Sequence, residues 1–239
     1  MHHLDVPDKE PELTEPPQPW TPRDVGWGLV SAVLLVVLLL VLGQLIQSLD
    51  LAIDSSLVVV FGTAILLIPV WYFTAYKYGT SLADLGLRGF RPAAVGLGCG
   101  LMVLAFAFNM LYGTLLGFFD LQIQPDIDLL FEGSSLPWLM FFGGAVVAPV
   151  VEEIFFRGFV FAGLRQRWGW PKAMVGSAGL FAIAHVIPTA ILPIFILGII
   201  FAYLYQRFDS IWPAILMHML TNTMALSVAY AVSQGLIEI

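Results

Sequence analysis

The sequence predicts an all-α protein, a polytopic transmembrane bundle of about seven helices, and three observations carry this prediction. Of the 239 residues, 59% are hydrophobic and only 11% are charged, a balance outside the range of soluble domains. Stretches without charged residues recur along the chain, and most can cross lipid once, because about 20 helical residues span the hydrocarbon core. These stretches are apolar on every side, whereas the helices of a soluble core keep a polar face at helical period. We expect six to eight helices.

Six stretches lack Asp, Glu, Lys and Arg altogether. The fifth, 173–206, is too long for one crossing and contains Pro188 and Pro193, so we expect a tight hairpin of two helices there. This division brings the expected number of crossings to seven. In chain order the stretches are 25–49, 55–76, 92–119, 133–151, 173–206 and 210–237.

The region before the first crossing, residues 1–24, has a different composition. Six prolines and six acidic residues fall in it, opposed by Lys9 and Arg23. We therefore expect a disordered acidic tail, followed by one transmembrane domain over 25–239. A signal peptide would need a short basic start, which this long acidic segment lacks.

Charge and cysteine content exclude two classes of protein. The formal net charge is −7, and no basic face is present that could bind nucleic acid. A single cysteine cannot form an internal disulfide.

The loops between crossings alternate in charge, and this predicts the orientation. By the positive-inside rule the basic loops are cytoplasmic, which places the N-terminus inside and the C-terminus outside. The basic loops contain Lys77, Arg88, Arg91, Arg165, Arg167, Lys172 and Arg207. The alternate loops contain Asp50, Asp54, Asp120, Asp126, Asp128 and Glu132.

The fourth crossing contains the most unusual part of the sequence. We expect it to open at Ser134 or Ser135, with Pro137 near the first turn, and to continue beyond its apolar limit to the basic loop. Pro149 has no backbone N–H to donate, so we expect a kink there, with the carbonyl of Ala145 released.

Three ionisable residues follow this proline at membrane depth: Glu152, Glu153 and Arg157. Each costs roughly 2.5–3.5 kcal/mol at the centre of a spanning helix, so the cluster indicates a function. Glu153 and Arg157 are four residues apart and are expected to pair, whereas Glu152 points about 100° away and is free to face a cavity. A purely structural ion-pair network of all three is the alternative interpretation.

Two histidines lie in later crossings, His185 and His218, and the chain's other two, His2 and His3, lie in the tail. A lone histidine on an apolar helix is most often a packing residue. Two of them beside an intramembrane acid favour water-activating chemistry instead. Asn222 lies one turn beyond His218, where its amide could orient the imidazole or donate to an oxyanion.

These residues form three ordered motifs. They are Glu-Glu-x-x-x-Arg at 152–157, Phe-x-x-x-His at 181–185 and His-x-x-x-Asn at 218–222. In this order on successive membrane helices, they resemble the CPBP family of CAAX proteases and bacteriocin-processing enzymes, which includes the Ras-converting CAAX endopeptidases. The family-like core is about 134–230, and residues 81–88 resemble the short amphipathic link that precedes it.

The resemblance implies an intramembrane peptidase with its site in a cavity of the bundle. By it, Glu152 is the general base that activates water, His185 assists, and His218 with Asn222 stabilises the oxyanion. The residues implied in support are Glu153, Arg157 and Phe181.

The resemblance also raises the question of a metal. One Glu and two His from separate helices could hold zinc with one open position: Glu152, His185 and His218. No His-Glu-x-x-His motif is present, and a metal-free glutamate mechanism is the prediction that we favour.

Two other functions fit parts of the pattern. A non-catalytic peptide-binding or bacteriocin-immunity protein would keep the site without hydrolysis. A proton or metal transporter would need ionisable groups on both sides of the site, whereas the polar groups here gather at one depth. The expected partners are a peptide or protein substrate and the lipid bilayer, in a prokaryotic plasma membrane.

Overall fold

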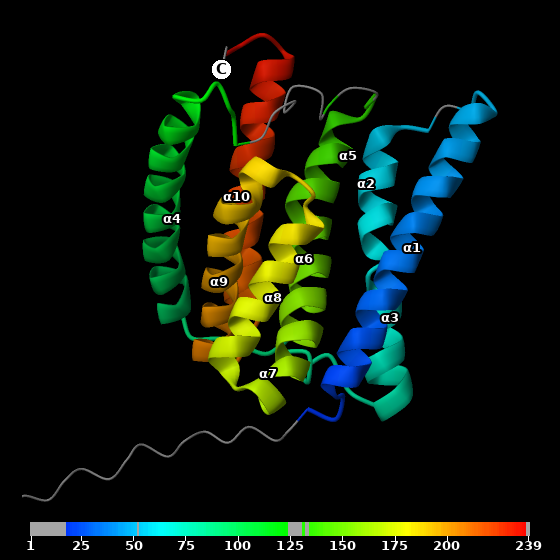
Figure 1. Cartoon of the computed structure of the whole chain (residues 1–239), viewed down its shortest axis with the longest axis vertical. Coiled ribbons are helices and arrows are strands. Elements are labelled where there is room, and N and C mark those ends of the chain that lie inside the picture. Colours follow the sequence, from blue (N-terminus) through cyan, green and yellow to red (C-terminus); the bar gives the residue numbers. More distant parts are fainter. Residues whose placement is uncertain (1–17, 52, 124–130, 132–133, 238–239) are drawn as a thin grey trace, which may run out of the picture.

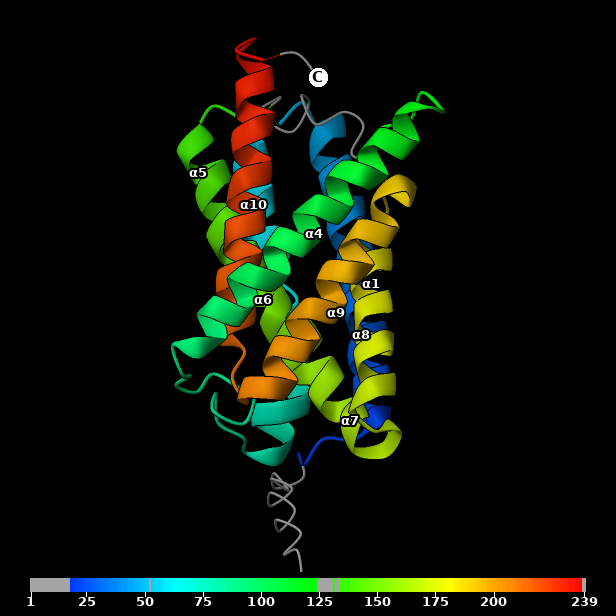
Figure 2. The ribbon, with the colours of Figure 1, turned by 90° about the vertical axis from the view of Figure 1, so that its left-hand side faces the viewer.

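The structure, a computed structural model, describes residues 18–51, 53–123, 131 and 134–237, and all the regular structure in these ranges is helical. The helices run side by side as a bundle (Figures 1 and 2). In chain order they are α1 (Pro22–Ser48), α2 (Ser55–Ala64), α3 (Leu67–Trp71), η1 (Tyr72–Tyr76), α4 (Ala93–Gly117), α5 (Pro137–Phe142), η3 (Gly143–Val147), α6 (Ala148–Glu153), η4 (Ile154–Phe161), α7 (Ala162–Trp168), α8 (Trp170–Ala184), η5 (Pro188–Ala190), α9 (Ile191–Phe208) and α10 (Trp212–Ser233).

The predicted all-α membrane bundle is confirmed. Within the described residues, six helical segments are long and apolar enough to cross a membrane. α8 is a seventh helix of 15 residues, about 22 Å long, and it pairs with α9 in the hairpin that the two prolines predicted. The six candidate spans are Pro22–Ser48, Ser55–Tyr76, Ala93–Gly117, Pro137–Trp168, Pro188–Phe208 and Trp212–Ser233.

Two predicted boundaries were wrong. α1 begins at Pro22, inside the segment assigned to the tail, because Thr21 and Asp24 form a capping box around its first turn. Residues 1–17 of the predicted tail lie outside the described residues. α5 begins at Pro137, because Ser135 is used elsewhere: its backbone N–H and hydroxyl donate to Asp54 at 2.7 and 2.5 Å. The Ser135 hydroxyl, with Ser56, holds the pKa of the Asp54 carboxyl well below its usual range.

The helix α5–η3–α6–η4–α7 is the centre of the bundle. All eight residues of η4 are buried, whereas the outer helix α1 exposes most of its apolar side chains, as expected of a surface in contact with lipid. Trp20, wholly buried, donates its indole N–H to the carbonyl of Phe159 at 3.0 Å. This contact joins the segment just before α1 to the helix that contains the acids.

The α8–α9 hairpin packs closely against this central helix. A Cβ at Gly198 of α9 would lie 2.9 Å from the Cα of Ala178 in α8, so only glycine permits this approach. From α8, buried Ser177 donates to the carbonyl of Phe156 in η4 at 2.8 Å. The three segments are thereby fixed around the position where Glu153 lies.

Candidate active site

The acids lie between two π-helical segments, η3 and η4. In η3 the N–H of Ala148 bonds to the carbonyl of Gly143, five residues back. In the same register the carbonyl of Gly144 would need the N–H of residue 149, which is proline. The carbonyl released by this register is therefore that of Gly144, one residue before the Ala145 that we predicted for an unbroken α-helix.

Asn222 of α10 supplies the hydrogen bond that the Gly144 carbonyl lacks within its own helix. Its Nδ2 donates to the carbonyl of Gly144 at 2.8 Å. The side chain predicted to act near an oxyanion thus joins α10 to the π turn before the acids. Because an amide nitrogen carries two hydrogens, one donor of Asn222 is left for another acceptor.

The predicted pairing of Glu153 and Arg157 is present in full. Their side chains are both 0% exposed, and Arg157 Nη1 donates to Glu153 Oε1 at 2.9 Å. Arg157 Nη2 donates to the carbonyl of Gly198 at 3.2 Å. The guanidinium carbon also lies 4.3 Å from the ring centre of Phe181 and 5.2 Å from that of Phe201, so the cation is enclosed by π faces.

His218 joins this buried pair. Its Nδ1 lies 2.9 Å from Glu153 Oε1, which already accepts from Arg157. Its ring stacks on Phe201 at 5.1 Å and 25°, and meets Phe181 edge-on at 5.5 Å. With two rings and one carboxylate around it, the imidazole has a fixed orientation.

The orientation of His218 points its second nitrogen at Glu152. Nε2 lies 3.7 Å from Glu152 Oε2, too far for a direct hydrogen bond but close for an ion pair. The Glu152 side chain is 19% exposed, unlike its buried neighbour Glu153. Among the described residues, Glu152 Oε2 has no hydrogen-bond partner.

His185 ends α8 and is half-buried. Its Nδ1 lies 2.8 Å from the carbonyl of Phe181, and because a carbonyl only accepts, Nδ1 carries the hydrogen and Nε2 has the free lone pair. The Phe181 ring contacts both His185, at 4.8 Å, and His218. Phe181 therefore lies against both histidine rings, a role that the motif alone did not reveal.

The residues raised as zinc ligands do not fit a metal site in this structure. Within the described ranges, no three His, Cys, Asp or Glu side chains are grouped closely enough to hold an ion. Glu152 and His218 are neighbours, whereas His185 bonds to the Phe181 carbonyl and packs against the Phe181 ring. We derive no step through a metal.

Two site residues were missed by sequence reasoning. Phe201 stacks on His218, and Gly198 supplies a carbonyl to Arg157, both from α9. Neither belongs to a motif. The one available signal was the absence of bulk at Gly198 and Ala178, which permits the two helices to approach closely.

Comparison with known proteins gives the same assignment for this part of the chain. Residues 134–224 match the family model "Type II CAAX prenyl endopeptidase Rce1-like". The "Putative membrane peptidase YdiL" of Bacillus subtilis (strain 168) is 33% identical over 100 residues, which are 42% of this chain and 39% of that relative. The chain thus covers less than half the length of this curated relative. No solved structure matches the chain.

The matched segment contains all three motifs and the helices from α5 to the first part of α10 that bring their side chains together. Through this segment, the chain is similar to the Rce1-like type II CAAX prenyl endopeptidases.

Proposed function

We propose that this protein is an intramembrane endopeptidase in which Glu152 activates water for peptide hydrolysis. The observation that carries the proposal is the contrast between two adjacent acids. Glu153 is sealed and its Oε1 is paired with Arg157 and His218, whereas the Glu152 side chain is partly exposed and faces His218 Nε2. A carboxylate in this situation can accept a proton, which is what a general base must do.

The proposed reaction follows from these positions. Glu152 takes a proton from water as the water oxygen attacks the peptide carbonyl carbon, and it later delivers that proton to the leaving amine nitrogen. The second Nδ2 hydrogen of Asn222 would stabilise the tetrahedral oxyanion, and His218 Nε2 would do so in the imidazolium form, in which both ring nitrogens carry hydrogens. His185, with Nδ1 bound to a carbonyl, would use Nε2 to orient the water or the substrate.

The supporting residues would act by holding His218 still. Arg157 neutralises Glu153, and Glu153 fixes the imidazole through Nδ1. A fixed donor needs little reorganisation when charge develops in the transition state.

The substrate that we propose is a membrane-proximal peptide, of CAAX type or a bacteriocin or leader peptide, entering from the lipid or its interface. The match of residues 134–224 to a peptidase family supports a peptidase reaction, and the depth of the acids in a spanning helix supports a lipid-shielded site. We place the N-terminus in the cytoplasm and the C-terminus outside a prokaryotic plasma membrane, following the charge of the loops.

The test is hydrolysis of a quenched fluorogenic peptide library by purified protein in nanodiscs. We expect Glu152→Gln and Glu152→Ala to lower kcat/KM by a factor of about 10²–10⁴, the usual contribution of a general base. His185→Ala should also lose activity. The matched control is Asp120→Asn, the same kind of acid-to-amide change at a position with φ of 55° that asparagine adopts readily.

Wild-type turnover by the Glu152 variants, together with normal folding, would contradict the catalytic assignment. Each protein is also assayed with and without a chelator. Activity that a chelator removes and zinc restores would contradict the metal-free mechanism while leaving the peptidase reaction in place.

A further inference from the structure

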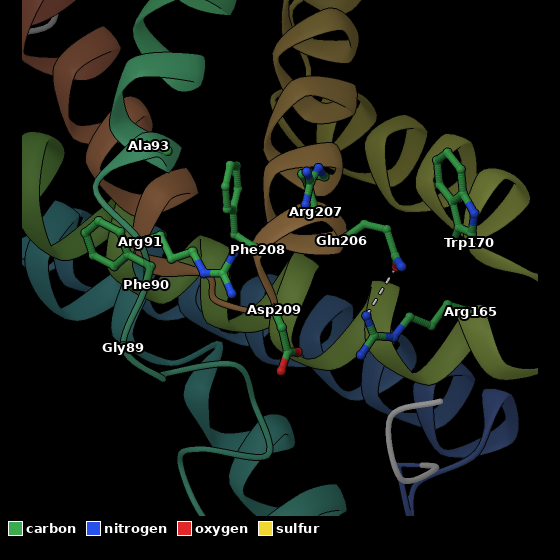
Figure 3. A pocket seen from close by; sticks show the side chains of 10 residues that line it. All are labelled: Gly89, Phe90, Arg91, Ala93, Arg165, Trp170, Gln206, Arg207, Phe208 and Asp209. Atoms are coloured by element: carbon green, nitrogen blue, oxygen red, sulfur yellow. Dashed lines mark hydrogen bonds between the residues drawn. The ribbon is translucent and has the colours of Figure 1, made fainter. Parts of the chain in front are cut away.

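A second polar site lies at the end of the bundle where α7 and α9 end. It is an open pocket of about 820 Å³, within the usual range of small-ligand sites. Three arginines line it from three different elements: Arg91 before α4, Arg165 in α7 and Arg207 in α9 (Figure 3). We refer to it as the arginine pocket. None of its lining residues belongs to the candidate active site.

The arginine pocket has more basic than acidic residues in its lining. Asp209 is the acidic residue in its lining, and it forms an ion pair with Arg88. Its negative charge is therefore already balanced by a cation outside the lining. Among the residues that the structure describes, Arg91 and Arg207 form no ion pair, and these two cations give the pocket its positive charge.

Aromatic rings and an amide orient two of these cations. Arg165 lies 5.1 Å from the ring centre of Tyr205. It also donates to Gln206 Oε1 at 3.3 Å (Figure 3). Arg207 lies 5.6 Å from the ring centre of Phe208. Oriented guanidinium groups present their N–H donors in fixed directions, which suits the oxygens of a phosphate.

A simpler explanation covers only part of this arrangement. Arg165 and Arg207 lie in the last turns of their helices, where a cation complements the helix dipole. Arg91 precedes a helix instead, so the dipole does not account for it. The helix dipole also does not explain why the three arginines line one pocket.

The position of the arginine pocket indicates what would reach it. The pocket lies at the ends of spanning helices, and Trp170 in its lining is 43% exposed, beside Trp168 at 46%. Exposed tryptophans at helix ends are typical of the level of lipid headgroups. Basic pockets between spanning helices at this level suit the phosphates of anionic lipids.

We propose that the arginine pocket binds the phosphodiester headgroup of an anionic phospholipid. A zwitterionic headgroup is a poorer ligand, because its ammonium group would lie against arginines. The site is independent of peptide hydrolysis: it would anchor and orient the bundle at this interface whether or not Glu152 is catalytic.

The experiment measures the lipids retained by the purified full-length protein, counted by native mass spectrometry after exchange into detergent. Phosphatidylglycerol, phosphatidylcholine and inorganic phosphate are titrated separately. We expect phosphatidylglycerol to bind with clear preference, and Arg91→Gln/Arg207→Gln to weaken it on the order of tenfold or more. The matched control is Arg167→Gln/Lys172→Gln, which removes two exposed charges from the same end of the bundle but outside the pocket.

Each other outcome contradicts the proposal. Equal loss in both double variants would mean attraction to general surface charge. Equal binding of the two lipids would show that the pocket does not select an anionic headgroup. Competition by inorganic phosphate at equal concentration would show that the site binds free anions instead of lipid. The charge-conserving variant Arg91→Lys/Arg207→Lys guards against misfolding: it should recover much of the binding, and failure to do so in a folded protein would also contradict the electrostatic basis.

Discussion

Neighbouring glutamates of one helix acquire opposite properties in this protein because they point in different directions. Glu153 is buried against Arg157 and His218, with Phe181 and Phe201 enclosing the cation. Glu152, about 100° further round the helix, is partly exposed beside His218. The buried acid positions the histidine, and the exposed acid is free for chemistry. Removing either one should therefore affect a different measurable property.

The first prediction concerns stability. Glu153→Gln leaves Arg157 buried without its counter-charge, and we expect a loss of about 3–5 kcal/mol in the free energy of unfolding in mixed micelles. Glu152→Gln, the same change one residue earlier, should cost much less, because Glu152 has no direct hydrogen bond to a cation.

A double variant completes this test. Glu153→Gln/Arg157→Gln removes both charges and should recover part of the stability lost by Glu153→Gln alone. Equal destabilisation by Glu152→Gln and Glu153→Gln would mean that the structure assigns the wrong acid to the buried pair.

At this scale, the local part of the site was predictable from sequence and the tertiary part was not. Spacing of four residues was enough to predict the Glu153–Arg157 pair. The contact of His218 with Glu153 depends on how α10 packs against α6, and no spacing encodes that packing. Phe201 acts on His218 through the shape of its ring alone, which has no signature in one sequence.

Helical elements position the site through their departures from the α-helix. The π turns on both sides of the acids add a residue per turn and change which side chains face α9 and α10. Pro149 predicted a departure from the α-helix near the acids. Pro188 and Pro193, within the apolar stretch 173–206, predicted the hairpin of α8 and α9. The register of the π turns could not be predicted, because the Gly144 carbonyl receives its hydrogen bond from the side chain of Asn222 in a distant helix.

The second prediction is a coupling between two elements. Asn222→Ala should cost about 1–3 kcal/mol of unfolding free energy, because it leaves the Gly144 carbonyl without a partner. In a Pro149→Ala background the cost should fall, because the new N–H of residue 149 can bond to that carbonyl. Thr223→Ala is the control, since its hydroxyl bonds within α10 to Met219, and its cost should be unchanged by Pro149→Ala. Identical costs of Asn222→Ala in both backgrounds would rule out this account of the π turn.

The third prediction tests the close approach of α8 and α9. Gly198→Ala places a methyl group 2.9 Å from the Cα of Ala178, so the helices must separate, at a cost of about 1–3 kcal/mol. Gly179→Ala in the same hairpin is the control, because its Cβ would meet nothing within 4 Å, and it should be neutral or stabilising. The thermal midpoint of each variant in detergent measures the difference. A neutral Gly198→Ala would mean that the hairpin is looser than the structure has it.

Across the whole molecule, charge separates the two ends of the bundle. The ends of α7 and α9 and the start of α4 carry the arginines of the arginine pocket, and the connection from α1 to α2 at the opposite end carries Asp50 and Asp54 (Figure 1). Successive loops lie at opposite ends of the bundle, and the loops alternate between basic and acidic along the chain. The separation of charge could therefore be predicted from the sequence. Sequence reasoning could not predict that three of the basic residues line one pocket, because they are far apart along the chain.

The last prediction assigns these ends to the sides of the membrane. In a Cys99→Ser background, Gln234→Cys reports the end of α10 and Lys172→Cys the start of α8, both at exposed positions. An uncharged, impermeant maleimide applied to intact cells should label Gln234→Cys and spare Lys172→Cys until the membrane is opened, because basic loops are retained in the cytoplasm. The reverse pattern would invert the orientation and place the arginine pocket in the outer leaflet. Labelling of both positions in intact cells would mean that the bundle crosses an even number of times, which would contradict the seventh helix, α8, as a crossing.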